Sequence, residues 1–243
     1  MSGAEERGPV LRLTDGILFE AGPYSWRVEP LRIRLGEWVA FVPRGPDPVV
    51  DPAGPLARIL ASLMRPSRGT VEIDEKDVYR LAYRDVQRLR ADLGFVQGYG
   101  GLLSNRTIRD IVALPLSVHG KLSMAEETRR VVDFLEVFAL DQVGDLKPHD
   151  VDGATRWRAC LARSLILSPR WVVMEGIGDW EMDRGRGVAW GRFREYRARK
   201  SSSGAICLSR KNPEFEAWFQ SEGGIVVEYL TRARAPEPGS EKA

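Results

Sequence analysis

The residues with the clearest bearing on chemistry lie in a proline-rich loop, 43–55, which follows an apolar strand pattern at 39–42. A strand, a loop and a helix in this order can cradle phosphate, given successive free backbone N–H groups, glycines and a lysine. Here five of the thirteen loop residues are prolines, which have no N–H to donate. The loop has no lysine, and Asp47 and Asp51 add negative charge. We therefore expect it to bind phosphate poorly, even with Arg44 or Arg58 as a substitute cation.

Composition and charge exclude several classes of function. The 243 residues suffice for one domain with a sizeable core, and a net charge of +2 gives no basis for binding nucleic acid. Cys160 and Cys207 lie in apolar runs and are predicted to be core residues rather than a disulfide or a metal site. Because the sequence has neither a membrane-span pattern nor a signal peptide, we expect a cytoplasmic protein that meets a membrane only through a partner.

Alternating strand and helix patterns predict an α/β fold with a mostly parallel core sheet. Strands are predicted at 10–13, 31–35, 38–42, 70–74, 93–97, 171–174, 205–209 and 225–229. Helices are predicted at 56–64, 83–91, 107–116, 124–139, 155–167, 188–199 and 213–219. Ser123 and Glu126 form a capping-box pattern, and Pro55 suits a first helical position. We expect loose ends at 1–9 and 233–243, and read His119 and His149 as solvated loop residues.

Four segments in fixed order resemble the ATPase domains of ABC transporters. They are Gly36–Val42, Leu56–Asp74, Arg88–Gln97 and Arg156–Pro169. The resemblance runs from about residue 10 to 230. It implies a P-loop NTPase-like ABC ATPase fold over 10–232, with an antiparallel β subdomain and a helical subdomain at about 98–165. It also implies Mg-ATP as the ligand, although the residues themselves predict no cofactor and no metal.

The phosphate-gripping residues of this family have no counterparts here. Its Lys-Ser-Thr triplet would fall on Ala53, Gly54 and Pro55, in a loop about four residues longer than the family's. Phe19 has two interpretations: it stands where the family stacks an aromatic ring on adenine, or it is a core residue.

The catalytic carboxylates and the switch histidine are also changed. Glu175 stands in the place of the family's Mg²⁺-associated aspartate, and Gly176 in that of its general base. If the alignment shifts by one residue, Glu175 becomes the base and Met174 replaces the aspartate. One of two required carboxylates is missing either way. Arg210 occupies the place of the switch histidine, and an arginine cannot shuttle protons near neutral pH.

The family's signature, Leu-Ser-Gly-Gly-Gln, becomes Val151, Asp152, Gly153, Ala154 and Thr155. Asp152 replaces the hydroxyl that would face phosphate. An aspartate at this point is a good cap for the helix that begins near Gly153. We therefore predict a capping role for Asp152 and repulsion of phosphate.

Gln97 keeps the glutamine that senses nucleotide and contacts the permease in this family. A loop containing glycines and leucines follows it at 98–107, and the helical insert 107–150 is of normal length. The resemblance thus implies a surviving permease-docking surface beside a lost ATP site, although Gln97 could also be an ordinary loop residue.

Three functions remain open on this basis. The first is a degenerate, non-catalytic ABC ATPase-domain protein, structural or regulatory, that docks on a membrane permease at the inner face of the cell membrane. It would work as a homodimer or with another ABC ATPase subunit. The second is a divergent but working ATP-binding subunit, for which the insert at 108–140 faintly suggests the lipid-trafficking type. The third is a regulatory protein that has kept the fold outside transport.

Overall fold

The computed structural model describes residues 10–21, 23–45, 50–97, 101–119, 122–175, 191, 195–196, 203–208 and 210–233. The chain divides into two compact units, which are treated separately below. The β-rich unit contains residues 1–82 and 205–243, and the helical unit contains residues 83–204. Within the described ranges, no helix is long and apolar enough to cross a membrane.

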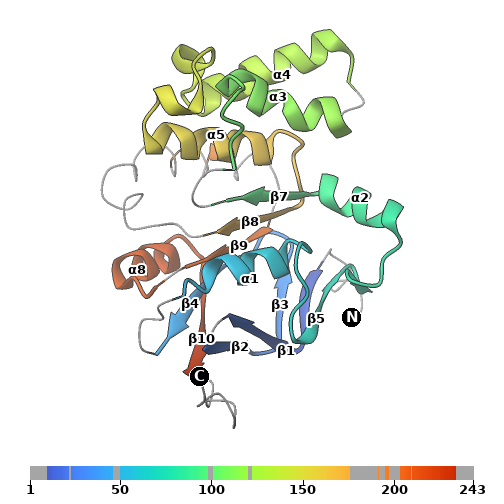
Figure 1. Ribbon diagram of the computed structural model, residues 1–243, viewed down its shortest axis with the longest axis vertical. Helices are drawn as coiled ribbons and strands as arrows, with labels where there is room; N and C mark the ends of the chain where they lie inside the picture. The colour runs from blue at the N-terminus through green and yellow to red at the C-terminus, as the bar shows by residue number, and fades with distance from the viewer. Residues whose placement is uncertain are drawn as a thin grey trace, which may run out of the picture. The chain divides into compact units, whose positions relative to one another are not determined.

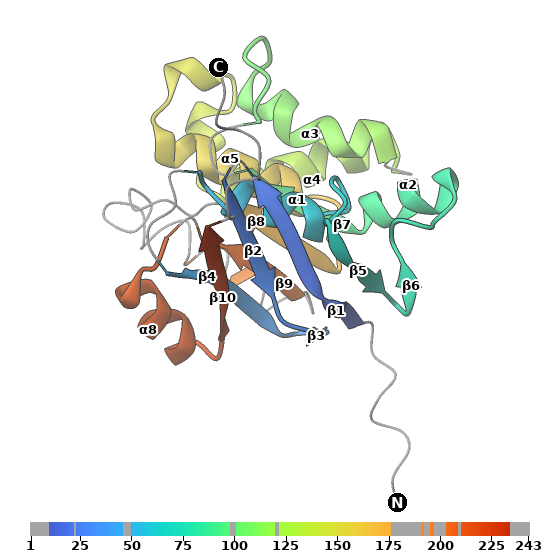
Figure 2. The same cartoon turned by 60° about the horizontal axis from the view of Figure 1, so that its bottom comes forward.

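The β-rich unit is built around a mainly antiparallel sheet (Figures 1 and 2). Its strands are β1 (Val10–Ala21), β2 (Tyr24–Val28), β3 (Leu31–Arg34), β4 (Trp38–Arg44), β5 (Arg68–Ile73), β6 (Lys76–Asp77) and β10 (Ile225–Ala233). β1 pairs antiparallel with β2, β3 and β5, while β10 pairs antiparallel with β2 and parallel with β4. β10 thereby joins the antiparallel strands to β4, which is buried from Trp38 to Pro43.

Two helices belong to this unit, α1 (Ala53–Leu60) and α8 (Pro213–Ser221), and the short strand β9 (Ser203–Cys207) enters it at Ala205. Leu56, Ala57, Ile59 and Leu60 give α1 one buried face. Tyr79 fixes the same helix, because its hydroxyl donates to the Ile59 carbonyl oxygen at 2.9 Å. Burial raises the pKa of that hydroxyl, which keeps it protonated as a donor.

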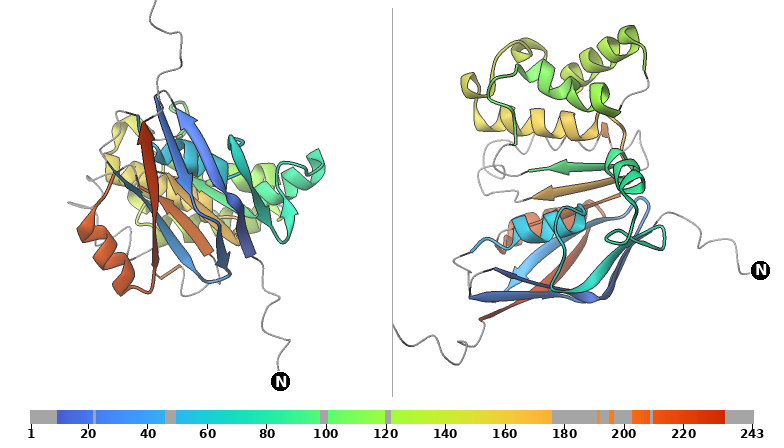
Figure 3. Two further views of the ribbon diagram at one scale, coloured as in Figure 1. Left: turned by 90° about the horizontal axis from the view of Figure 1, so that it is seen from below. Right: turned by 45° about the vertical axis from the view of Figure 1, so that its right-hand side comes forward.

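The helical unit combines two parallel strands with three longer helices (Figures 1 and 3). Its elements are α2 (Tyr83–Ala91), β7 (Leu93–Val96), α3 (Ile108–His119), α4 (Met124–Val137), the 3₁₀ turns η1 (Asp141–Val143) and η2 (Pro148–Asp150), α5 (Gly153–Leu165) and β8 (Trp171–Glu175). α3 packs against both α4 and α5. Arginine side chains tie these helices to main-chain carbonyls: Arg158 donates to the Ala139 oxygen at 2.8 Å, and Arg130 to the Ile166 oxygen at 2.6 Å.

Most predicted elements within the described residues are confirmed; the differences are shifted ends and short strands that were not predicted. β1 continues through Asp15 and Gly16, which both have positive φ. These residues resemble the end of a strand in the sequence, but they form a register shift within β1. β2 was missed altogether. The capping box of α4 is confirmed, and Cys160 and Cys207 are buried.

Three smaller predictions need correction. α1 begins at Ala53 rather than Pro55; the first turn tolerates the proline because N–H groups there have no helical acceptor. His119 is the last residue of α3 and His149 lies in η2, so neither is in a loop. Ala233 still belongs to β10 rather than to a loose tail. The predicted helix 188–199 falls largely outside the described residues, as do the ends 1–9 and 234–243.

Gly69 in β5 provides a stability test of this unit. It has φ +83°, and a Cβ there would lie 1.7 Å from the Gly16 carbonyl oxygen. Gly223 has a similar φ of +78° with no atom within 4 Å of a Cβ, and is the matched control. We expect Gly223→Ala to cost about 1 kcal/mol of unfolding free energy from backbone strain, and Gly69→Ala about 2 kcal/mol more from the clash. Urea denaturation measures both, and equal costs would contradict the close approach.

Candidate functional site

A carboxylate of the chain itself lies at the start of α1, in the segment where the resemblance predicts the phosphate loop. Residues 46–49 lie outside the described part of the loop, and the chain is described again from Val50 into α1. The Asp51 carboxylate accepts a hydrogen bond from the Ala53 backbone N–H at 2.8 Å. That N–H is among the first of the helix, at the positive end of its dipole, where an anion would bind. Asp51 therefore satisfies one of the backbone donors at the N-terminus of α1.

The remaining residues at this position offer little to an anion. Ala53 and Gly54 are buried and have no side-chain donor, and Pro55 has no N–H. Arg44, a candidate substitute cation at the end of β4, forms an ion pair with Glu228 of β10. Lys211 lies 3.6 Å from the same carboxylate. Arg58, the other candidate, is exposed on α1.

Phe19 is not available to stack on a ligand. Its side chain is only 1% exposed, so it is a core residue of the β-rich unit. The ring stacks on Trp26 with centroids 5.3 Å apart and lies 6.3 Å from the ring of Tyr229. These neighbours come from β2 and β10. The local sequence around Phe19 therefore could not decide between a ring that stacks on adenine and a core residue.

The signature-equivalent residues begin α5 with a second carboxylate at a helix N-terminus. Asp152 is the N-cap residue, and its carboxylate accepts from the Thr155 backbone N–H at 2.7 Å. Hydrogen bonds from Thr155, first from its side chain and then from its backbone, hold the pKa of Asp152 below its ordinary value. The charges of Arg158 and Arg156 add to the effect. Asp152 is thus an anion held at the N-terminus of α5 by the Thr155 amide.

The rest of this turn is engaged within the helical unit. Val151, Gly153 and Ala154 are half-buried, and Thr155 is buried. The Thr155 hydroxyl accepts from Arg158 at 2.9 Å. Its oxygen is therefore already used by an intramolecular donor.

The acidic strand end provides one buried carboxylate. Glu175 is the last residue of β8 and is 8% exposed. Gly176 lies outside the described residues and has no side chain that could act as a base. Arg210, in the switch-histidine place, is exposed in the β-rich unit.

Gln97 follows β7 and lies against its own loop. A Cβ at Gly101 would come within 2.6 Å of the Gln97 side-chain oxygen, and Gly101 has φ +67°. The Gly101 carbonyl oxygen accepts from Arg163 of α5. The loop is therefore joined to the helix that follows the signature position.

Beside this loop, a pocket of about 270 Å³ is lined by residues of α2, β7, α3 and α5, and we call it the α3–α5 pocket. Leu93, Phe95 and Leu114 contribute apolar side chains, and Arg90 and Arg163 contribute charge. Sequence inspection missed it because its walls come from three separate segments, 90–95, 114–119 and 163–167. The only sequence signal was the apolar character of α3.

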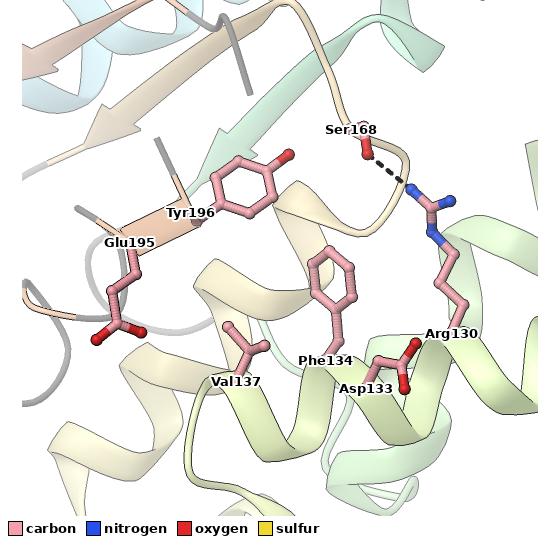
Figure 4. A pocket seen from close by; sticks show the side chains of 7 residues that line it. All are labelled: Arg130, Asp133, Phe134, Val137, Ser168, Glu195 and Tyr196. Carbon is pink, nitrogen blue, oxygen red and sulfur yellow. Dashed lines mark hydrogen bonds between the residues drawn. The ribbon is translucent and has the colours of Figure 1, made fainter. Parts of the chain in front are cut away.

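A second pocket of about 260 Å³, shown in Figure 4, lies along one face of α4. Phe134, Val137 and Tyr196 form its apolar walls. Arg130 at its edge donates to the Ser168 hydroxyl at 2.7 Å, the dashed line in Figure 4. This pocket contains none of the residues predicted to handle nucleotide.

Part of the chain is similar in sequence to curated bacterial methionine import ATP-binding proteins. It is 34% identical over 115 residues to MetN 1 of Pseudomonas fluorescens and 33% over 141 residues to MetN of Mesorhizobium japonicum. These matches cover 47% and 57% of this chain, and 34% and 37% of the relatives. The chain thus spans about a third of the length of the curated relatives it matches. No protein-family model matches.

Solved structures establish the fold. The dimeric bacterial ABC transporter cassette MJ0796 superposes with a TM-score of 0.69 at 16% identity, over 93% of this chain and 99% of that one. The protein cbiO1 from Clostridium perfringens, part of the ABC transporter complex cbiONQ, gives 0.66 at 17% identity, over 83% and 79%. The chain therefore has the fold of an ABC transporter ATP-binding cassette.

Proposed function

We propose that this chain is a non-catalytic ABC cassette, structural or regulatory, that docks on a membrane permease at the inner face of the membrane. The observation that carries the proposal is the pair of carboxylates at the two helix N-termini where the family would bind phosphate. Asp51 accepts from the Ala53 N–H at 2.8 Å, and Asp152 from the Thr155 N–H at 2.7 Å. Each occupies an amide that phosphate would need.

The magnitudes favour loss of nucleotide binding. Two like charges 4 Å apart at an effective dielectric constant near 20 repel by about 4 kcal/mol. No lysine stands in the loop to offset this, and Arg44 is already paired with Glu228. Hydrolysis would suffer further, because the absence of a base that activates water costs on the order of 10²–10⁴ in rate.

Both halves of a family-type composite site are affected. In such dimers, one subunit supplies the phosphate loop and acidic strand, and the other supplies the signature. This chain has a carboxylate at the helix N-terminus of each half, Asp51 in one and Asp152 in the other. A homodimer would therefore have no working site, and a mixed dimer would be impaired at both, which favours a structural or regulatory role.

A working ATP-binding subunit is the second candidate. Its support is the sequence likeness to proteins named as methionine import ATP-binding proteins and the presence of Glu175 at the end of β8. Release of inorganic phosphate from Mg-ATP separates the two candidates, with Glu175→Gln as the matched variant. We expect the purified chain to show only background release, unchanged by Glu175→Gln. Phosphate release that disappears in Glu175→Gln would overturn the proposal and establish Glu175 as a catalytic carboxylate.

The capping role of Asp152 predicts a specific pattern of stability. Asp152→Ala should cost about 1 kcal/mol of unfolding free energy at neutral pH, while Asp152→Ser should cost less than about 0.5 kcal/mol because serine also caps. Urea titrations of the three proteins measure these differences. An equal loss in both variants would argue against the cap.

The lowered pKa of Asp152 also sets the sign of a pH dependence. A carboxyl whose folded pKa is depressed stabilises the protein above its unfolded pKa, about 3.9 for aspartate. Any advantage of wild type over Asp152→Asn should be complete near neutrality and be lost as the pH falls through the folded pKa of Asp152. Urea titrations of both proteins from about pH 7 to about pH 3 test this. A difference in unfolding free energy that does not change with pH would contradict it.

A further inference from the structure

The pocket of about 260 Å³ along α4 combines aromatic walls with acidic side chains, and we call it the α4 pocket. Phe134, Val137 and Tyr196 form the apolar part of its wall, and Asp133 and Glu195 each add a carboxylate. In Figure 4 the two carboxylates lie on opposite sides of the Phe134 and Val137 side chains. The volume is below the usual range for drug-sized ligands, about 300–1,000 Å³, so it suits a smaller molecule.

The aromatic walls of the α4 pocket form a surface that attracts positive charge. The rings of Phe134 and Tyr196 pack edge to face, with centroids 6.1 Å apart and an interplanar angle of 64°. The face of an aromatic ring carries partial negative charge, and cations bind against it. Phe134 already binds a cation within the chain, because the guanidinium carbon of Arg130 lies 5.9 Å from its ring centroid.

Arg130 is the one cation among the described residues that line the α4 pocket, and it is engaged within the chain. Its Nε donates to the Ile166 carbonyl oxygen at 2.6 Å, and a terminal nitrogen donates to the Ser168 hydroxyl at 2.7 Å. The Tyr196 hydroxyl donates to the Leu165 carbonyl oxygen at 3.2 Å, and burial raises its pKa, so it stays neutral. The positive charge at this side of the pocket is therefore partly compensated before any ligand binds.

Asp133 supplies negative charge that is not compensated in the same way. Its side chain is exposed on α4, and within the described part of the chain it has no hydrogen bond or ion pair. With Glu195, the described lining has two carboxylates and one guanidinium. A carboxylate beside an aromatic face is a pairing that recognises ammonium groups. The charge of the α4 pocket therefore complements a cation better than an anion.

We propose that the α4 pocket binds a small organic ammonium ion. The charge of the ligand lies near Asp133 and the aromatic rings, and its apolar body packs against Phe134 and Val137. This site goes beyond the proposed function, because none of its residues was predicted to handle nucleotide. Its test therefore gives the same answer whether or not the chain hydrolyses ATP.

The test compares two probes of nearly the same shape on the full chain. Phenethylamine carries a positive charge at neutral pH, and phenethyl alcohol is its uncharged counterpart. Calorimetry extended to millimolar probe measures both affinities. We expect the amine to bind at least about tenfold tighter, equivalent to about 1.4 kcal/mol. Equal affinity, or no binding of either probe, would overturn the proposal.

An anion of similar size tests the role of Arg130. Hydrocinnamate has the same ring and a carboxylate in place of the ammonium group. We expect it to bind more weakly than phenethyl alcohol, because Asp133 and Glu195 repel it. If hydrocinnamate binds more tightly than the amine, Arg130 rather than the carboxylates selects the ligand, and the proposal fails.

Three variants assign the effect to residues of α4. Asp133→Asn removes the charge but keeps the size, so it should weaken phenethylamine by about threefold or more and leave the alcohol unchanged. Glu136→Gln removes the same charge from an exposed position of α4 that does not line the pocket, and should change neither affinity. Val137→Phe fills the pocket and should weaken both probes. An equal loss of amine affinity in Asp133→Asn and Glu136→Gln would show that net charge selects the amine, and would overturn the proposal.

Discussion

The structure depends on which groups satisfy the free backbone N–H groups at the N-termini of α1 and α5. The first backbone N–H groups of a helix have no helical acceptor, and they attract an anion of some kind. In a nucleotide-binding cassette that anion is phosphate, whereas this chain uses its own side chains. Asp51 occupies the start of α1, and Asp152 the start of α5. Each carboxylate accepts from an N–H group at the start of its helix, and we propose that both make these positions unfavourable for phosphate.

Arginine side chains of the helical unit also form hydrogen bonds within the chain. Arg130, Arg158 and Arg163 all donate to main-chain carbonyls of the helical unit. A guanidinium with several fixed donors can satisfy carbonyl groups where helices and loops end. Much of the positive charge described in this unit therefore holds the helices and the Gln97 loop together. The net charge is only +2 because 34 acidic residues offset the 36 lysines and arginines.

Local patterns predicted the parts of the structure that depend on near neighbours. The capping box of α4 joins Ser123 to Glu126, and the cap of α5 joins Asp152 to Thr155, so short sequence windows contain both. Interactions between distant segments could not be predicted in this way. Arg163 meets Gly101 across 62 positions, and the burial of Phe19 depends on Tyr229 of β10. The alternating pattern indicated the fold class, but the α3–α5 pocket forms only when three separate segments come together.

The central claim, that carboxylates have replaced phosphate at the helix N-termini, is tested most directly by equilibrium binding of Mg-ATP. Calorimetry on the purified chain, extended to millimolar nucleotide, measures this without any need for turnover or a partner. The account predicts no binding heat and no rise in melting temperature. Binding at micromolar affinity would contradict it, and would mean that other groups, such as Arg58 or Arg210, have taken over the phosphate contacts.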